Sequence, residues 1–105
     1  MASENWVDIA IADEVAEGDV KGVLAGEKQL AVFRIKGTYY VTSNICTHGN
    51  ACLSDGYLDG DRIECPLHQG LFHVPTGKAL APPATEPIRT YPVRLENGRI
   101  QTKLD

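Results

Sequence analysis

The chain has 105 residues, of which 43% are hydrophobic and 23% are charged, and its formal net charge is −4; these values describe one soluble globular domain. Its acidic balance argues against nucleic acid or an anionic membrane as a partner, and its apolar runs are too short to span a bilayer. The N-terminus has no basic segment followed by an apolar run, so we expect no secretory signal and a cytoplasmic protein.

The first 42 residues are predicted to form short strands separated by turns. Apolar, β-branched and aromatic residues favour strands in four segments: residues 5–9, 19–24, 30–35 and 39–42. Lys36-Gly37 lies between the last two segments and is a good signal for a hairpin turn. Residues 12–18 are acidic and end in glycine, so we expect at most one helical turn there.

The second half of the chain continues in the same way. Strands are expected in four further segments: residues 62–64, 71–74, 88–95 and 99–104. Asp55-Gly56 and Asp59-Gly60 mark turns, and residues 80–84 are predicted to be an irregular loop because Pro82 and Pro83 cannot donate to a ladder. No segment has the length and 3.6-residue period of a long helix, so we predict an all-β sandwich or barrel.

Two short clamps between residues 46 and 68 contain the most specific chemistry of the chain. Cys46 and His48 form the first clamp, Cys65 and His68 form the second, and 16 residues separate them. Together they supply the two thiolates and two imidazoles that a binuclear iron–sulfur centre of mixed ligation requires. A zinc site is the alternative, although zinc clamps usually pair Cys with Cys and His with His.

The pattern C-T-H-G followed by C-P-L-H-Q-G resembles that of Rieske proteins, in which Cys-x-His and Cys-x₂-His are separated by a gap of similar length. The similarity extends over the whole chain, including F-H-V-P-T-G-K-A-L after the second clamp. The chain most resembles the small Rieske ferredoxins of bacterial aromatic-ring dioxygenases of the naphthalene and biphenyl type. This resemblance implies one Rieske-type [2Fe–2S] cluster, with Cys46 and Cys65 on the inner iron and His48 and His68 on the outer iron.

The same resemblance implies a Rieske-type antiparallel β sandwich with an inserted cluster-binding subdomain of two clamp loops. The base would comprise residues 1–42 and 85–105, and the inserted subdomain residues 43–84. The implied function is that of an electron carrier and not of an enzyme. Such a protein is monomeric alone and passes single electrons from a flavin-dependent ferredoxin reductase to a terminal aromatic-ring-hydroxylating oxygenase.

Two other functions stay open at this point. One is a small Rieske-like subunit of a larger oxidoreductase, such as assimilatory nitrite reductase. The other is a zinc-stapled β interaction domain with no redox role, which would be colourless and free of iron.

Differences from the respiratory Rieske proteins predict how the cluster is tuned. Those proteins brace the cluster with a disulfide, whereas Leu67 replaces one of its cysteines here and leaves Cys52 without a partner. They also have a serine and a tyrosine where this chain has Gly70 and Phe72, so two hydrogen bonds to sulfur are lost. Because such bonds stabilise the reduced cluster, we expect a low reduction potential of about −150 mV.

The remaining residues of interest have simpler interpretations. By the resemblance, Pro82 and Pro83 cover the cluster and exclude water. His73 is expected to be a surface strand residue, because four ligands are already supplied. An odd cysteine count leaves Cys52 over, as a small buried filler or a partly exposed thiol, and points to a reducing compartment. Acidic residues near the clamps are expected on a solvated face and would favour partners with basic surfaces.

Overall fold

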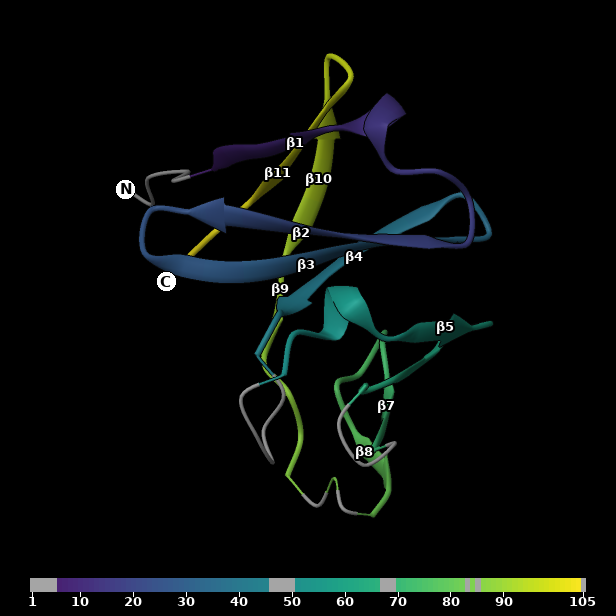
Figure 1. Ribbon diagram of the computed structural model, residues 1–105. Coiled ribbons are helices and arrows are strands. Elements are labelled where there is room, and N and C mark those ends of the chain that lie inside the picture. The colour runs from purple at the N-terminus through teal and green to yellow at the C-terminus, as the bar shows by residue number, and fades with distance from the viewer. Residues whose placement is uncertain (1–5, 46–50, 67–69, 83, 85, 105) are drawn as a thin grey trace.

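The computed structural model describes residues 6–45, 51–66, 70–82, 84 and 86–104. Within these residues the structure is built from short strands in three antiparallel sheets, with two three-residue 3₁₀ helices, η1 (Ala12–Glu14) and η2 (Leu53–Asp55) (Figure 1). The all-β prediction is therefore confirmed. Neither of these helices approaches the length that crossing a membrane would require.

The central sheet has four strands, in the order β2 (Asp19–Ala25), β3 (Lys28–Ile35), β4 (Thr38–Ser43) and β9 (Thr90–Tyr91). The turn between β3 and β4 consists of Lys36 and Gly37, both of which have a positive φ, of 51° and 78°. Positive φ at both central residues is the geometry of a type I′ turn, which matches the twist of the flanking strands. The hairpin predicted at this dipeptide is confirmed.

A three-stranded sheet lies across the central sheet, in the order β1 (Val7–Ile11), β11 (Arg99–Thr102) and β10 (Val93–Glu96) (Figure 1). Its central strand contributes Ile100, which is fully buried together with Leu30 and Val32 of β3. These contacts make the core of a sandwich between the two sheets.

A third sheet of four very short strands has the order β5 (Tyr57–Asp59), β6 (Arg62–Glu64), β7 (Leu71–His73) and β8 (Ala79–Ala81). Figure 1 shows it on the opposite side of the central sheet from β1, β10 and β11. Its buried residues Ile63 and Phe72 pack with Phe33 of β3 in a second hydrophobic core.

Strand β3 therefore supplies both cores. Its residues Leu30, Ala31, Val32 and Phe33 are all fully buried. Because successive side chains of a strand point to opposite faces, Leu30 and Val32 enter the core of the sandwich, whereas Ala31 and Phe33 enter the core beneath the third sheet. The run of four apolar residues at this point reflects a strand buried on both sides.

Three of the sequence predictions are wrong in detail. The strand expected at residues 88–95 is two strands, because Pro92 has no N–H and the chain changes sheets there: β9 pairs with β4 and β10 pairs with β11. The irregular loop expected at residues 80–84 begins with strand β8, which ends before the prolines. Strand β5 was expected only as a link between two turns.

The two chain crossings between the central sheet and the third sheet lie side by side. Ser43, the last residue of β4, donates its N–H to the carbonyl of Arg89 at 2.9 Å, and the N–H of Ile88 reaches Gly77 O at 2.9 Å. The chain thus returns to the central sheet beside the point at which it left.

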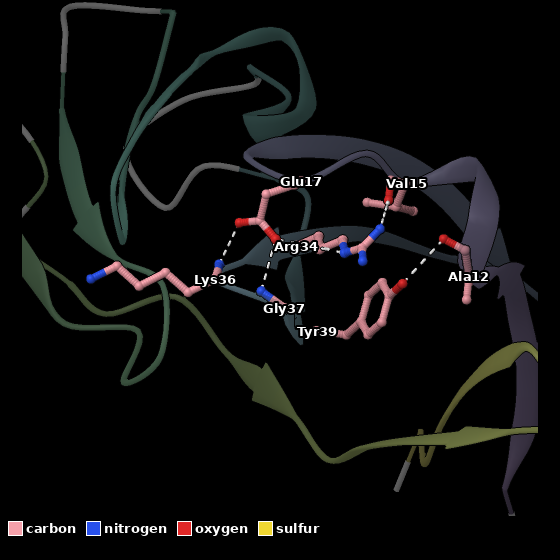
Figure 2. Close-up of polar contacts among 7 residues, drawn as sticks. All are labelled: Ala12, Val15, Glu17, Arg34, Lys36, Gly37 and Tyr39. Atoms are coloured by element: carbon pink, nitrogen blue, oxygen red, sulfur yellow. Dashed lines mark hydrogen bonds and ion pairs between the residues drawn. The ribbon is translucent and has the colours of Figure 1, made fainter.

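The segment after η1 is tied to the β3–β4 hairpin by a small polar network (Figure 2). The carboxylate of Glu17 accepts hydrogen bonds from the N–H groups of Lys36 and Gly37, the second at 2.8 Å. The Nε atom of Arg34 in β3 lies 3.7 Å from Glu17 Oε1. The Tyr39 hydroxyl of β4 donates a hydrogen bond to Ala12 O in η1 at 3.2 Å. The Glu17 carboxylate thus replaces water at both N–H groups of the turn.

We predict that Glu17→Ala lowers the stability of the protein by about 1 kcal/mol, because two backbone donors lose a charged acceptor but can still bind water. The readout is the midpoint of thermal unfolding followed by circular dichroism. Glu27→Ala, in the exposed β2–β3 turn, is the control and should leave the midpoint unchanged. Equal midpoints for both variants would contradict the role given to Glu17.

Candidate functional site

Of the four predicted ligands, the structure describes Cys65. Cys46, His48 and His68 lie outside the described residues, as does Pro83 among the residues predicted to surround the cluster. Within the described part of the chain no three histidine, cysteine or carboxylate side chains gather closely enough to hold a metal ion. The described elements on either side of the two clamps define the surroundings of the site.

The second clamp is carried by the hairpin of β6 and β7. Glu64 and Leu71 form the last ladder pair, and the N–H of Cys65 then donates to the carbonyl of Gly70 at 2.7 Å. The side chain of Cys65 is fully buried in the same core as Phe72. This hydrogen bond joins the two ends of the segment from Cys65 to Gly70. The buried side chain of Cys65 lies on the core side of the hairpin end.

The first clamp is carried by the segment between β4 and η2. Ile45 and Cys52 form an isolated antiparallel bridge, and the N–H of Leu53 donates to the carbonyl of Asn44 at 2.7 Å. Residues 46–51 are therefore also closed at their base. Leu53 and Cys65 belong to one hydrophobic core, so the bases of both clamp segments pack against the same apolar side chains.

Gly56 allows the strands next to the second clamp to approach closely. A Cβ atom at this position would lie 2.1 Å from the carbonyl oxygen of Glu64, which no side chain can tolerate without a shift of the backbone. The sequence indicated Asp55-Gly56 as a turn, and the structure adds that glycine is required by the contact with the residue before Cys65.

The residues predicted around the cluster differ in their surroundings. Gly70 is buried and its carbonyl is engaged by Cys65, and the ring of Phe72 is fully buried without any polar atom. Pro82 is exposed, in a turn in which the N–H of Ala84 donates to Ala81 O at 3.0 Å. Neither Gly70 nor Phe72 offers a side-chain donor.

His73 is held within the third sheet. Its Nδ1 lies 2.7 Å from Thr76 Oγ1, and its Nε2 lies 3.0 Å from Asp61 Oδ2. Thr76 lies in the turn after β7, and Asp61 lies in the turn between β5 and β6. The half-buried ring therefore braces these turns, in keeping with its expected place on a strand.

Acidic side chains face outward next to the second clamp. Asp59 and Glu64 line a shallow hollow of about 150 Å³ together with Tyr57, Arg62 and Leu71. Tyr57 is 67% exposed and Asp59 is also exposed, whereas Glu64 is half-buried, so this face of the third sheet combines apolar surface with acidic groups.

The residues present fit an iron–sulfur centre of mixed ligation. The donor set of the two clamps contains two thiolates and two imidazoles, and the described thiol is enclosed by apolar side chains that keep water away. Sequence reasoning missed Asn44, whose buried side chain bonds to Ser54 on the far side of the first clamp segment. The signal was an asparagine just before the clamp and a serine just after it.

Comparison with known proteins agrees with this arrangement. Residues 5–92 match the model of the Rieske [2Fe-2S] domain. The ferredoxin component of the naphthalene 1,2-dioxygenase/salicylate 5-hydroxylase systems of Ralstonia sp is 52% identical over 103 residues, which are 98% of this chain and 99% of that protein.

Two solved structures are similar over their full length. The ferredoxin of Sphingomonas yanoikuyae B1 is 42% identical, with a TM-score of 0.92 over 96% of this chain and 100% of that one. A chain in the complex of reduced oxygenase and oxidized ferredoxin in carbazole 1,9a-dioxygenase is 37% identical, with a TM-score of 0.88 over 98% of this chain and 100% of that one.

Proposed function

Because this chain belongs to the Rieske [2Fe–2S] family, we propose that it is the ferredoxin component of a bacterial aromatic-ring-hydroxylating dioxygenase system. In this role it is an electron-transfer protein and has no catalytic activity of its own. It receives single electrons from a flavin-dependent ferredoxin reductase and delivers them to the terminal oxygenase. The observation that carries the proposal is the 52% identity, over nearly the whole length of both chains, to a naphthalene dioxygenase ferredoxin component.

The ligands of this proposal are Cys46 and Cys65 on the inner iron and His48 and His68 on the outer iron. When bound, the cluster accepts and releases one electron at a time. The chain holds it at the ends of two segments whose bases share a core, and the buried position of Cys65 supports the inner assignment.

The low reduction potential that we expect follows from two positions at which the chain offers no side-chain hydrogen-bond donor to sulfur. A serine at position 70 or a tyrosine at position 72 would offer hydroxyl groups to sulfur, whereas Gly70 and Phe72 offer none. Without these bonds the extra negative charge of the reduced state is less stabilised. A potential of about −150 mV, at the low end of the Rieske range, suits transfer from a flavin to an oxygenase.

The remaining assignments follow from the same role. The base comprises residues 1–42 and 85–105 and the cluster-binding subdomain residues 43–84, which is supported by a third sheet whose strands all lie between residues 57 and 81. Pro82 and Pro83 cover the cluster, and the exposure of Pro82 is compatible with a surface loop.

We further propose a cytoplasmic protein that is monomeric alone. Two of the three cysteines are assigned to the cluster, and within the described residues Cys52 forms no disulfide, as expected in a reducing compartment. The carboxylates on the outward face of the third sheet suit partners with basic surfaces.

Electron delivery to an oxygenase tests the proposed function. The purified protein is reduced with dithionite, freed of excess reductant, and mixed with oxidised terminal oxygenase of a naphthalene 1,2-dioxygenase system, naphthalene and oxygen. We expect hydroxylated product in proportion to the reduced protein supplied. A reduced protein that keeps its electrons in the presence of oxygenase would overturn the proposal, and its co-purification with a larger oxidoreductase chain would favour the subunit alternative.

Replacement of the buried cysteine tests the ligand assignment. We predict that Cys65→Ser purifies with little or no iron and lacks the visible absorbance of the cluster, because the hydroxyl is a much poorer iron ligand than a thiolate. The matched control is Cys52→Ser, which removes the remaining cysteine and should keep wild-type iron content. A normal spectrum of Cys65→Ser would remove Cys65 from the ligand set.

The tuning argument predicts that Gly70→Ser raises the reduction potential, because its hydroxyl can donate to a sulfur and stabilise the reduced cluster. Redox titration of the purified protein, with the reduced signal followed by EPR, measures the change. Gly70→Ala adds a Cβ atom without a hydroxyl and should not reproduce the increase. An equal shift in both variants would assign the effect to packing instead of hydrogen bonding.

A further inference from the structure

Asn44 is a buried polar residue at the entrance to the first clamp segment. Its side chain is 5% exposed, and it lies between β4 and the Ile45–Cys52 bridge. Its Oδ1 accepts a hydrogen bond from the N–H of Ser54 at 2.8 Å, and its Nδ2 donates to Ser54 Oγ at 3.0 Å. We call this reciprocal pair the Asn44–Ser54 clasp.

The backbone of Asn44 is bonded on two further sides. Its N–H donates to the carbonyl of Gln29 in β3 at 2.9 Å, and its own carbonyl accepts from the N–H of Leu53 at 2.7 Å. One residue thus joins the central sheet to both the entry and the exit of residues 46–51. The antiparallel bridge between Ile45 and Cys52 adds a further backbone pairing, one residue closer to the clamp.

Gly22 of β2 makes room for the clasp. A Cβ atom at this position would lie 2.8 Å from Ser54 Oγ and 3.0 Å from Asn44 Nδ2. The backbone of Gly22 has no positive φ that would demand glycine, so the contact with the clasp is what a side chain here would disturb. Figure 1 shows the short coil after β4 next to the central sheet, and η2 contacts β2.

We propose that the Asn44–Ser54 clasp positions the first clamp segment and thereby determines how firmly the protein retains its cluster. The inference rests on the proposed ligation by Cys46 and His48, which lie two and four residues after Asn44. A buried amide whose oxygen and nitrogen are both hydrogen-bonded to one residue favours a single rotamer, and that rotamer sets the spacing between the two ends of the segment. Asn44 is thus assigned a positioning role, which it exerts through its bonds to Ser54, Leu53 and Gln29.

The test measures iron release from the intact holoprotein in the presence of a chelator. Because Asn44→Ala leaves the N–H and hydroxyl of Ser54 without their partner at the base of the clamp segment, the variant should lose the visible absorbance of the cluster about tenfold faster than the wild type. Thr102→Val is the matched control. It also removes a buried hydrogen bond, from Thr102 Oγ1 to Pro92 O at 2.6 Å, but in the three-stranded sheet, and should release iron at close to the wild-type rate.

One further readout and two further variants separate positioning from a general loss of stability. In Asn44→Ala the EPR lines of the reduced cluster should broaden, and in Thr102→Val they should not. Asn44→Asp should restore slow iron release, because its carboxylate can accept from both the N–H and the hydroxyl of Ser54. Gly22→Ala, which presses on the clasp without removing a donor or acceptor, should also accelerate release.

Equal rates of iron release for Asn44→Ala and Thr102→Val would overturn the proposal, as would a failure of Asn44→Asp to restore retention. If Asn44→Ala does not fold, Ser54→Ala replaces it, since this variant loses only the hydroxyl bond, and the same comparison decides. The assay needs no reductase or oxygenase. A wild-type protein with a stable cluster that delivers no electrons would therefore refute the proposed function and leave this test intact.

Discussion

The architecture depends on one strand that is buried on both faces. Strand β3 alternates its side chains between two cores, with Leu30 and Val32 on one side and Ala31 and Phe33 on the other. Burial of an apolar side chain is the largest favourable contribution to folding, and here a single run of residues provides it to both halves of the molecule. A change of register by one residue would exchange the two sets, so the alternation also fixes which face meets the redox-active half.

The half that carries the clamps has strands too short to be stable alone. Strands of three residues provide few ladder bonds, and a small sheet needs a hydrophobic face against another element. Phe33, Phe72 and Ile63 supply that face. The thiol of Cys65 lies in the same core, so the position of a proposed iron ligand is coupled directly to the packing of the central sheet.

The sequence predicted the parts of the structure that local chemistry determines. Alternation and turn dipeptides located most strands and the Lys36-Gly37 hairpin, and two mixed Cys–His clamps identified the type of centre. It did not predict features that arise from contacts between distant residues. The change of sheet at Pro92 depends on which strands β9 and β10 meet, and β5 and β8 become strands only by pairing with β6 and β7. The Asn44–Ser54 pair packs against Gly22, which lies about twenty residues earlier in the chain.

The hydrogen bond between Ser43 and Arg89 joins the two ends of the segment between them, which we call the cassette. Its two ends are adjacent on the central sheet, so the distance between β4 and β9 does not fix the length of the intervening segment. Deletion alone would expose Ala31, Phe33 and Ile35 to water, because they form the floor on which the cassette rests. A replacement segment must therefore present an apolar surface that is complementary to these three side chains. This requirement limits which segments the central sheet can accept more than the spacing of their ends does.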